Sequence, residues 1–116
     1  MHIQLNTDNI LSANESLARD VEAILDSALG RFDARLTRVE VHLNDVNSSQ
    51  KTGPADIRCM LEARVTGSEP VAVTDHGPTV DVAVRGAGGK MQRALDSALG
   101  RRNDHRHDKP DLAAEV

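Results

Sequence analysis

The residues best placed for binding chemistry are cations late in the chain. Residues 79–109 hold seven Lys or Arg against four Asp or Glu, whereas residues 1–78 hold seven against twelve. The candidate phosphate-binding side chains are Arg85, Lys90, Arg93, Arg101 and Arg102, with Arg106 and Lys109 beyond them. A strip of this kind can neutralise several phosphates of a nucleic acid, and each contact adds to affinity and to its salt dependence. The alternative is a solvated helix face whose charge complements a helix C-terminus.

A glycine-rich stretch lies inside the same segment. Its sequence is Arg85-Gly86-Ala87-Gly88-Gly89-Lys90. A nucleotide phosphate loop requires glycine, four residues and then Gly-Lys-Ser/Thr, following a strand. Val84 stands where the first glycine is required, and Met91 replaces the hydroxyl residue. The stretch therefore predicts no nucleotide hydrolysis.

Two other groups of residues could support chemistry, and neither leads to an enzyme. Cys59 is the single cysteine and is expected to point inward from a central strand, where a thiol acts as a small hydrophobe. His105 and His107 are two residues apart in a polar segment, and Arg106 between them opposes cation binding. We therefore expect no catalytic residue, no metal and no cofactor.

The overall composition excludes several classes of function. Phe32 is the only aromatic residue, so stacking platforms for bases and aromatic cages for cations cannot be built. The net charge of −4 argues against a general nucleic-acid binder. The single cysteine fits a reducing compartment, and no secretory signal or membrane-spanning run is expected. These observations predict one cytoplasmic domain without a membrane partner or a small-molecule substrate.

Alternating apolar residues predict four strands. A short strand is expected at 2–6, and longer ones at 37–44, 56–65 and 70–76, the last at an edge because it begins with proline. The inward side chains should be Ile3, Leu5, Val39, Val41, Leu43, Ile57, Cys59, Leu61, Ala63, Val65, Val71 and Val73. The opposite face should carry Arg38, Glu40, His42, Arg58, Met60, Glu62 and Arg64. Its near balance of charge predicts a solvated face of cross-strand ion pairs, with a protein-contact surface around Met60 as the alternative.

Helical periodicity predicts two helices. Ser12 and Glu15 have capping-box spacing before a helix at about 13–29, which Gly30 should end in a left-handed conformation. A second apolar stripe runs from Val80 to Leu99 and should end at Gly100. Three glycines inside it cost ~1 kcal/mol each relative to alanine, so this helix should be weak or bent near its middle.

One heptapeptide occurs twice. Leu-Asp-Ser-Ala-Leu-Gly-Arg fills residues 25–31 and again residues 95–101. The simplest interpretation is two helix C-termini with the same chemistry, and an internal duplication is the alternative. The order strand-helix-strand-strand-strand-helix predicts an α+β two-layer sandwich. A mostly antiparallel four-stranded sheet should carry both helices on one face, over residues 1–101, followed by a mobile polar tail at 102–116.

Two segments resemble a known family. The opening Met1-His2-Ile3-Gln4-Leu5 before a capped helix is similar to the start of ribosome hibernation-promoting factors and ribosome-associated inhibitors, also called sigma-54 modulation proteins. The last helix resembles theirs through Asp81, Ala83-Val84, Lys90-Met91, Arg93 and Leu95. The resemblance spans about residues 1–101 in the order of its elements.

The resemblance implies a function and its residues. Family members bind the decoding region of the small ribosomal subunit, block messenger and transfer RNA, and silence translation under stress. The implied partners are the small subunit and its rRNA. Lys90 and Arg93 would contact phosphates, and Arg85, Arg101 and Arg102 would extend the basic face.

The charge of the first helix supports an alternative hypothesis. Glu15, Asp20, Glu22 and Asp26 outnumber Arg19 there. The alternative is a protein-interaction module that keeps the fold and has lost RNA binding. Its complex should persist at ~1 M salt, where the Debye length falls to ~3 Å and phosphate contacts are screened.

Overall fold

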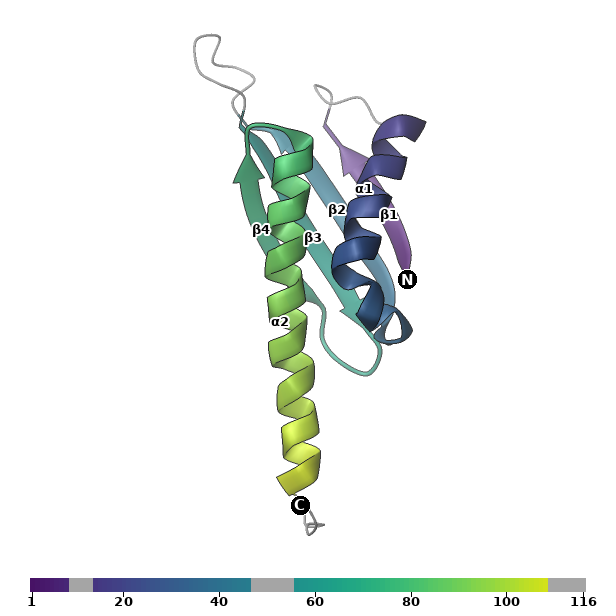
Figure 1. The fold of residues 1–116 in the computed structure, drawn as a ribbon, viewed down its shortest axis with the longest axis vertical. Coiled ribbons are helices and arrows are strands. Elements are labelled where there is room, and N and C mark those ends of the chain that lie inside the picture. Colours follow the sequence, from purple (N-terminus) through teal and green to yellow (C-terminus); the bar gives the residue numbers. More distant parts are fainter. Residues whose placement is uncertain (9–13, 47–55, 109–116) are drawn as a thin grey trace.

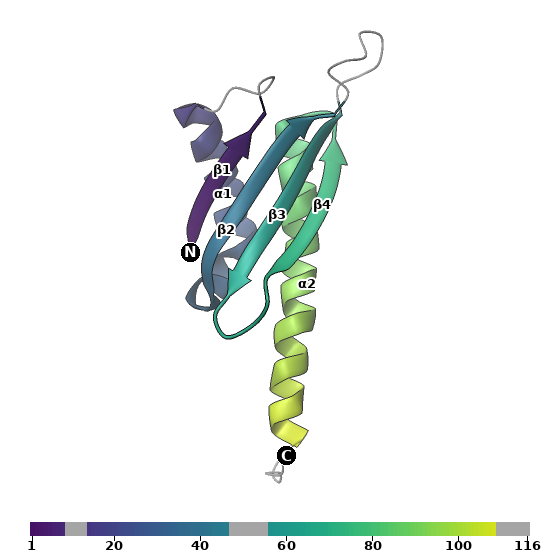
Figure 2. The same cartoon turned by 180° about the vertical axis from the view of Figure 1, so that it is seen from behind.

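The computed structural model describes residues 1–8, 14–46 and 56–108, with side chains as far as Gly100. The elements are β1 (His2–Thr7), α1 (Glu15–Leu29), the 3₁₀ helix η1 (Gly30–Arg35), β2 (Leu36–Asp45), β3 (Ile57–Val65), β4 (Val71–Gly77) and α2 (Val80–Asp108). Both α-helices pack on one face of the sheet, and the opposite face is uncovered (Figures 1 and 2). The predicted α+β two-layer architecture is confirmed.

The sheet is mixed, with strand order β1-β2-β3-β4. β1 runs parallel to β2, because α1 returns the chain to the starting end of the sheet between them. The β2–β3 and β3–β4 pairs are antiparallel, so the sheet is mostly antiparallel as predicted. β4 lies at an edge, as predicted from Pro70, which directly precedes the strand.

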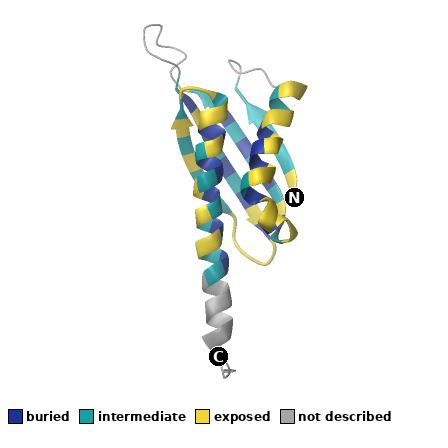
Figure 3. Ribbon diagram, viewed as in Figure 1, coloured by how far each residue is buried: buried dark blue, intermediate teal, exposed yellow. Residues whose placement is uncertain are grey.

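The core is aliphatic apart from Phe32, Cys59 and Met91, and its buried residues lie on the sheet and on the helix turns that face it (Figure 3). The predicted inward residues of β2 and β3 are all buried, whereas Val71 and Val73 on edge strand β4 are half-buried. The helices contribute Val21, Ile24, Leu25, Leu29, Ala83, Val84, Ala87, Met91, Leu95 and Leu99. No polar or charged residue is buried in the described part of the chain.

The start of α1 differs from the prediction. The N-cap is Asn14, whose side chain accepts a hydrogen bond from the Leu17 backbone N–H at 2.8 Å. The predicted cap, Ser12, lies outside the described residues. Asparagine caps helices as well as serine does, and Asn14 has the required spacing to the free N–H at Leu17. The helix therefore starts two residues later than the capping-box pattern suggested.

The end of α1 also differs. Gly30 is right-handed (φ −57°, ψ −34°), and its N–H bonds to the Asp26 carbonyl before the chain continues into η1. The predicted left-handed terminator is wrong. Of the described residues, Gly67 is the one glycine with a positive φ (71°), in the turn between β3 and β4.

Helix α2 is one unbroken helix that runs past Gly100 to Asp108, so the predicted bend and the predicted end are both wrong. Figure 1 shows it extending beyond the end of the sheet. Gly86 lies where a Cβ would overlap the Asp75 carboxylate, and a Cβ at Gly88 would lie 3.2 Å from the Ala28 Cβ. These glycines let β4 and α1 approach α2 closely, and that packing offsets their low helix propensity. Of the predicted tail, residues 102–108 have helical backbone and 109–116 lie outside the described residues.

The repeated heptapeptide has two backbone outcomes. Residues 25–31 end α1 and enter η1, whereas residues 95–101 lie inside α2. The interpretation as two helix C-termini is therefore wrong for the second copy.

Candidate nucleic-acid interface

Helix α2 positions the predicted cations around its exposed surface. Its buried stripe runs through Ala83, Val84, Ala87, Met91 and Leu95. Arg85, Lys90 and Arg93 fall outside that stripe and are exposed. Arg101 and Arg102 continue the helical backbone, and their side chains lie outside the described residues. Arg85 and Lys90 are five positions apart, which is about 140° around a helix with 3.6 residues per turn, so they lie on opposite flanks.

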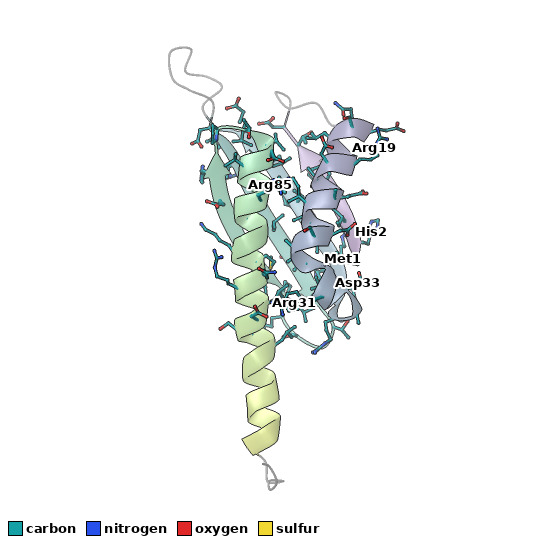
Figure 4. All side chains as sticks on the ribbon, viewed as in Figure 1. Met1, His2, Arg19, Arg31, Asp33 and Arg85 are labelled. Atoms are coloured by element: carbon teal, nitrogen blue, oxygen red, sulfur yellow. The ribbon has the colours of Figure 1, made fainter. Side chains whose placement is uncertain are left out.

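Arg85 lies on the flank that faces α1 (Figure 4). Its Nε donates to Asp81 Oδ2 at 2.9 Å, one helical turn earlier. A cavity of about 330 Å³ lies beside this pair, lined by Asp20, Ala23, Ile24, Ser27, Asp81 and Arg85. Two carboxylates at this position compete with any phosphate for the guanidinium.

Lys90 lies on the flank that faces edge strand β4. Its Nζ donates to the Thr74 carbonyl at 2.9 Å and lies 3.4 Å from Asp75 Oδ1. The pKa of Asp75 is below its usual value: the hydrogen bond from the His76 backbone N–H lowers it most, burial opposes this, and the Lys90 ammonium lowers it further. Gly86 leaves the space that this carboxylate occupies against the helix. Lys90 therefore already holds an anion and a backbone acceptor.

Arg93 differs from both. It is exposed and makes no hydrogen bond or ion pair with the residues that the structure describes. Of the three described candidates, it is the one whose charge is not matched by a carboxylate. A phosphate could bind it without displacing a protein group.

Helix α1 carries the opposite charge. Glu15, Asp20, Glu22 and Asp26 are exposed, and Arg19 lies 3.9 Å from Glu15. Near the end of α1, Arg31 donates to Asp96 of α2 at 2.6 Å and lies over the Phe32 ring, 4.4 Å from its centroid. The helix face is therefore acidic over α1 and basic along α2.

The uncovered sheet face carries the polar residues predicted for it, but not the predicted cross-strand ion pairs. Arg38 lies opposite Arg64, and Glu40 lies opposite Glu62. Arg38 pairs instead along its own strand with Glu40 at 3.0 Å, and Glu40 lies 3.5 Å from His42. The prediction failed because register, which alternation does not determine, placed like charges side by side.

A second cavity opens on this face, and sequence reasoning missed it. Its volume is about 390 Å³, and it is lined by Asn6, Thr7, His42, Leu43, Asn44, Arg58 and Met60. These residues come from β1, β2 and β3, which meet through the pairs Asn6–His42, His42–Met60 and Asn44–Arg58. Alternation indicated only that His42, Arg58 and Met60 share a face.

Other chemistry finds little support in the described residues. Cys59 is buried on central strand β3, as predicted, and burial, together with the charge of Asp75, raises the pKa of its thiol to about 12. It is therefore a protonated thiol at neutral pH and a poor nucleophile. No three metal-ligating side chains gather in the described part of the chain, and the side chains of His105 and His107 lie outside it. Among the described helices, none is long and apolar enough to cross a membrane.

Comparison with known proteins identifies solved structures that share this fold. No family model and no curated protein matches the sequence. Two solved structures match in three dimensions. The Protein Y N-terminal domain of Thermus thermophilus aligns with a TM-score of 0.67 at 15% identity, over 84% of this chain and 98% of that one. A ribosomal subunit interface protein from Coxiella burnetii aligns with a TM-score of 0.70 at 14% identity, over 86% and 99%.

The chain has the Protein Y fold. The resemblance to the hibernation-promoting factor family, inferred from the first strand and the last helix, is confirmed at the level of the fold. At these identities the similarity shows architecture, and function must be argued from the surfaces of this chain.

Proposed function

We propose that this protein binds the small ribosomal subunit through its rRNA and inhibits translation under stress, as a hibernation factor in the cytoplasm. The observation that carries the proposal is the fold, which matches nearly the whole of a protein named for the ribosomal subunit interface. The proposal assigns no catalytic residue, metal or cofactor.

Helix α2 supplies the proposed rRNA contacts. Arg93 is the first of them, because its guanidinium is exposed and has no carboxylate partner among the described residues. Lys90 and Arg85 would have to exchange Asp75 and Asp81 for phosphates. Exposed pairs of this kind contribute only about 0–1 kcal/mol, so the exchange is accessible. Arg101 and Arg102 extend the same helix.

The test is cosedimentation of the purified chain with separated ribosomal subunits across a salt series. We expect binding to the small subunit that weakens steadily as salt rises, because released counterions dominate phosphate binding. The double substitution K90E/R93E should abolish it. The matched control is R19E, which reverses an exposed arginine on α1 and should leave binding within about twofold on this account. Unchanged binding of the double variant at physiological salt would contradict the proposal.

A second candidate function also has an observation in its favour. Two of the three described cations on α2 are paired with carboxylates, and α1 is acidic. Both features suit a module that binds a protein partner instead of RNA. Such a complex should survive ~1 M salt, where screening removes phosphate contacts, so the same salt series separates the two functions.

A further inference from the structure

The cationic side chains of the molecule differ in their ion-pair and hydrogen-bond partners. Five of the described Lys and Arg side chains are paired with carboxylates: Arg19 with Glu15, Arg31 with Asp96, Arg38 with Glu40, Arg85 with Asp81 and Lys90 with Asp75. Arg58 instead donates to the neutral amide oxygen of Asn44 at 3.1 Å, and no described carboxylate pairs with it. Its neighbour on β4, His76, lies 3.3 Å from Asp56, and that carboxylate makes no ion pair with Arg58. Arg58 also lines a cavity.

Residues of β1, β2 and β3 line that cavity, and His42, Arg58 and Met60 among them belong to the face opposite the buried side chains. Figure 2 shows that no helix covers this face of the sheet. The cavity volume of about 390 Å³ is within the range of small-ligand sites. Asn6, His42 and Met60 form one cross-strand row, and Asn44 with Arg58 forms the next. A row of hydrogen-bonding side chains therefore lies beside the Arg58 guanidinium.

These groups match the parts of a nucleotide. The Arg58 guanidinium has several donors in a planar fork that suits phosphate oxygens. Asn6 uses its Nδ2 on the Val41 carbonyl at 3.4 Å, which leaves its carbonyl oxygen to accept from a base edge. His42 and Asn44 add further donors or acceptors, and the Met60 thioether offers a polarisable surface for an aromatic base. The chain has no Tyr or Trp to stack a base, so recognition must come from groups of this kind.

We propose that this cavity binds one nucleotide of single-stranded RNA, with a phosphate at Arg58 and the base over Met60. The inference rests on the proposed function only in choosing RNA as the source of the nucleotide. The base edges of a duplex are already paired, so an unpaired nucleotide is required to fill the cavity.

Neighbouring charges determine at which end of the cavity the RNA phosphate binds. Glu40 and Glu62 occupy the row beyond Met60 and repel phosphate from the middle of the sheet. Arg64, also without a described carboxylate partner, lies six residues from Arg58 on β3, or about 20 Å at 3.3 Å per residue. The phosphate must therefore enter at the Arg58 end, and Arg64 is too distant to contact the same nucleotide.

The test is an NMR titration of the ¹⁵N-labelled full chain with a short single-stranded RNA of mixed sequence at low salt. We expect the largest shifts at the amides of Asn6, His42, Asn44, Arg58 and Met60. R58Q should weaken binding about tenfold, because a hydrogen bond to a charged group contributes roughly that factor. R64Q is the matched control, since it removes the same charge from the same face and strand outside the cavity, and it should weaken binding less than about threefold on the same scale.

A gain-of-affinity variant and a competing ligand complete the experiment. E62Q removes a nearby carboxylate and should tighten binding, a result that misfolding cannot produce. Equal losses in R58Q and R64Q, or shifts confined to α2, would overturn the proposal. A free mononucleotide that saturates the cavity at lower concentration than the oligonucleotide would overturn the choice of RNA. If the chain fails to cosediment with ribosomes but shows the expected titration, the proposed ribosome binding is contradicted and the nucleotide site is supported.

Discussion

Residues 25–31 and 95–101 have the same sequence, Leu-Asp-Ser-Ala-Leu-Gly-Arg, and different structures. The first copy ends α1 and enters a 3₁₀ helix, whereas the second lies inside α2. The residues that follow explain the difference. Phe32 and Leu36 are buried after the first copy, so the chain must turn back toward the sheet. Only polar residues follow the second copy as far as residue 108, so no apolar side chain there requires the chain to turn toward the sheet, and the helix continues. A local sequence therefore permits a helix end without imposing one.

The charged side chains of the two copies also differ in their partners. Asp96 of the second copy accepts from Arg31 of the first at 2.6 Å, so the copies are joined to each other. Asp26, the equivalent of Asp96, makes no ion pair with a described residue. Identical side chains thus acquire different roles from what lies across the helix interface.

The largest expected effect tests what the copies share. Leu25 and Leu95 are both fully buried, at 0% exposure. Truncating either to alanine should lower the free energy of unfolding by about 2–5 kcal/mol, through lost apolar burial and the cavity left behind. Denaturant unfolding of L25A and L95A measures this. A small effect in only one variant would show that the copies are not equivalent in the core.

A smaller effect should separate the copies. Ala28 and Ala98 are both half-buried, but Ala28 lies against Gly88 of α2, where an added Cβ on the glycine would be 3.2 Å from the Ala28 Cβ. A28L should destabilise the chain by about 1–3 kcal/mol, because the two helices cannot separate without losing contact. A98L should destabilise the chain less than A28L, because no close approach to a described glycine is found at Ala98. Thermal unfolding of the two variants gives the comparison, and equal losses would refute it.

The glycines should respond alike despite their different surroundings. Gly30 is right-handed and Gly100 is helical, and neither has an atom within 4 Å of the position a Cβ would take. G30A and G100A should each stabilise the fold by about 0.4–1 kcal/mol, because alanine loses less backbone entropy on folding. Destabilisation by G30A would indicate that the native chain needs a conformation at residue 30 that alanine disfavours.

The smallest effect concerns the aspartates. D96N removes the exposed pair with Arg31 and should cost no more than about 1 kcal/mol. D26N should cost less than that, since Asp26 has no described ion-pair partner. The difference between the variants should shrink at high salt, where exposed charges are screened. A difference that is independent of salt would mean that Asp96 acts through packing or a neutral hydrogen bond.

In the candidate sites, too, the sequence showed some features and only the tertiary structure showed the others. Helical spacing identified Arg85, Lys90 and Arg93 as cations on the last helix, and the structure places all three at its surface. It did not reveal that Asp75 holds Lys90, because Asp75 reaches α2 from β4. The Asp81–Arg85 pair, by contrast, has the i,i+4 spacing of neighbours on one helix. Alternation likewise assigned His42, Arg58 and Met60 to one face. Only the pairing of β1 with β2 and β2 with β3 brings Asn6 and Asn44 beside them.

The sequence by itself determined the order of the elements, the inward faces of the strands and the location of positive charge on the last helix. These features follow from local periodicity, which fixes which side chains share a face. The tertiary structure decided where α2 ends, which cations are neutralised and where the sheet face is hollowed. Those outcomes depend on residues distant in sequence, such as Asp75 at Gly86 and Asn6 at His42, and their approach is set by packing and strand register.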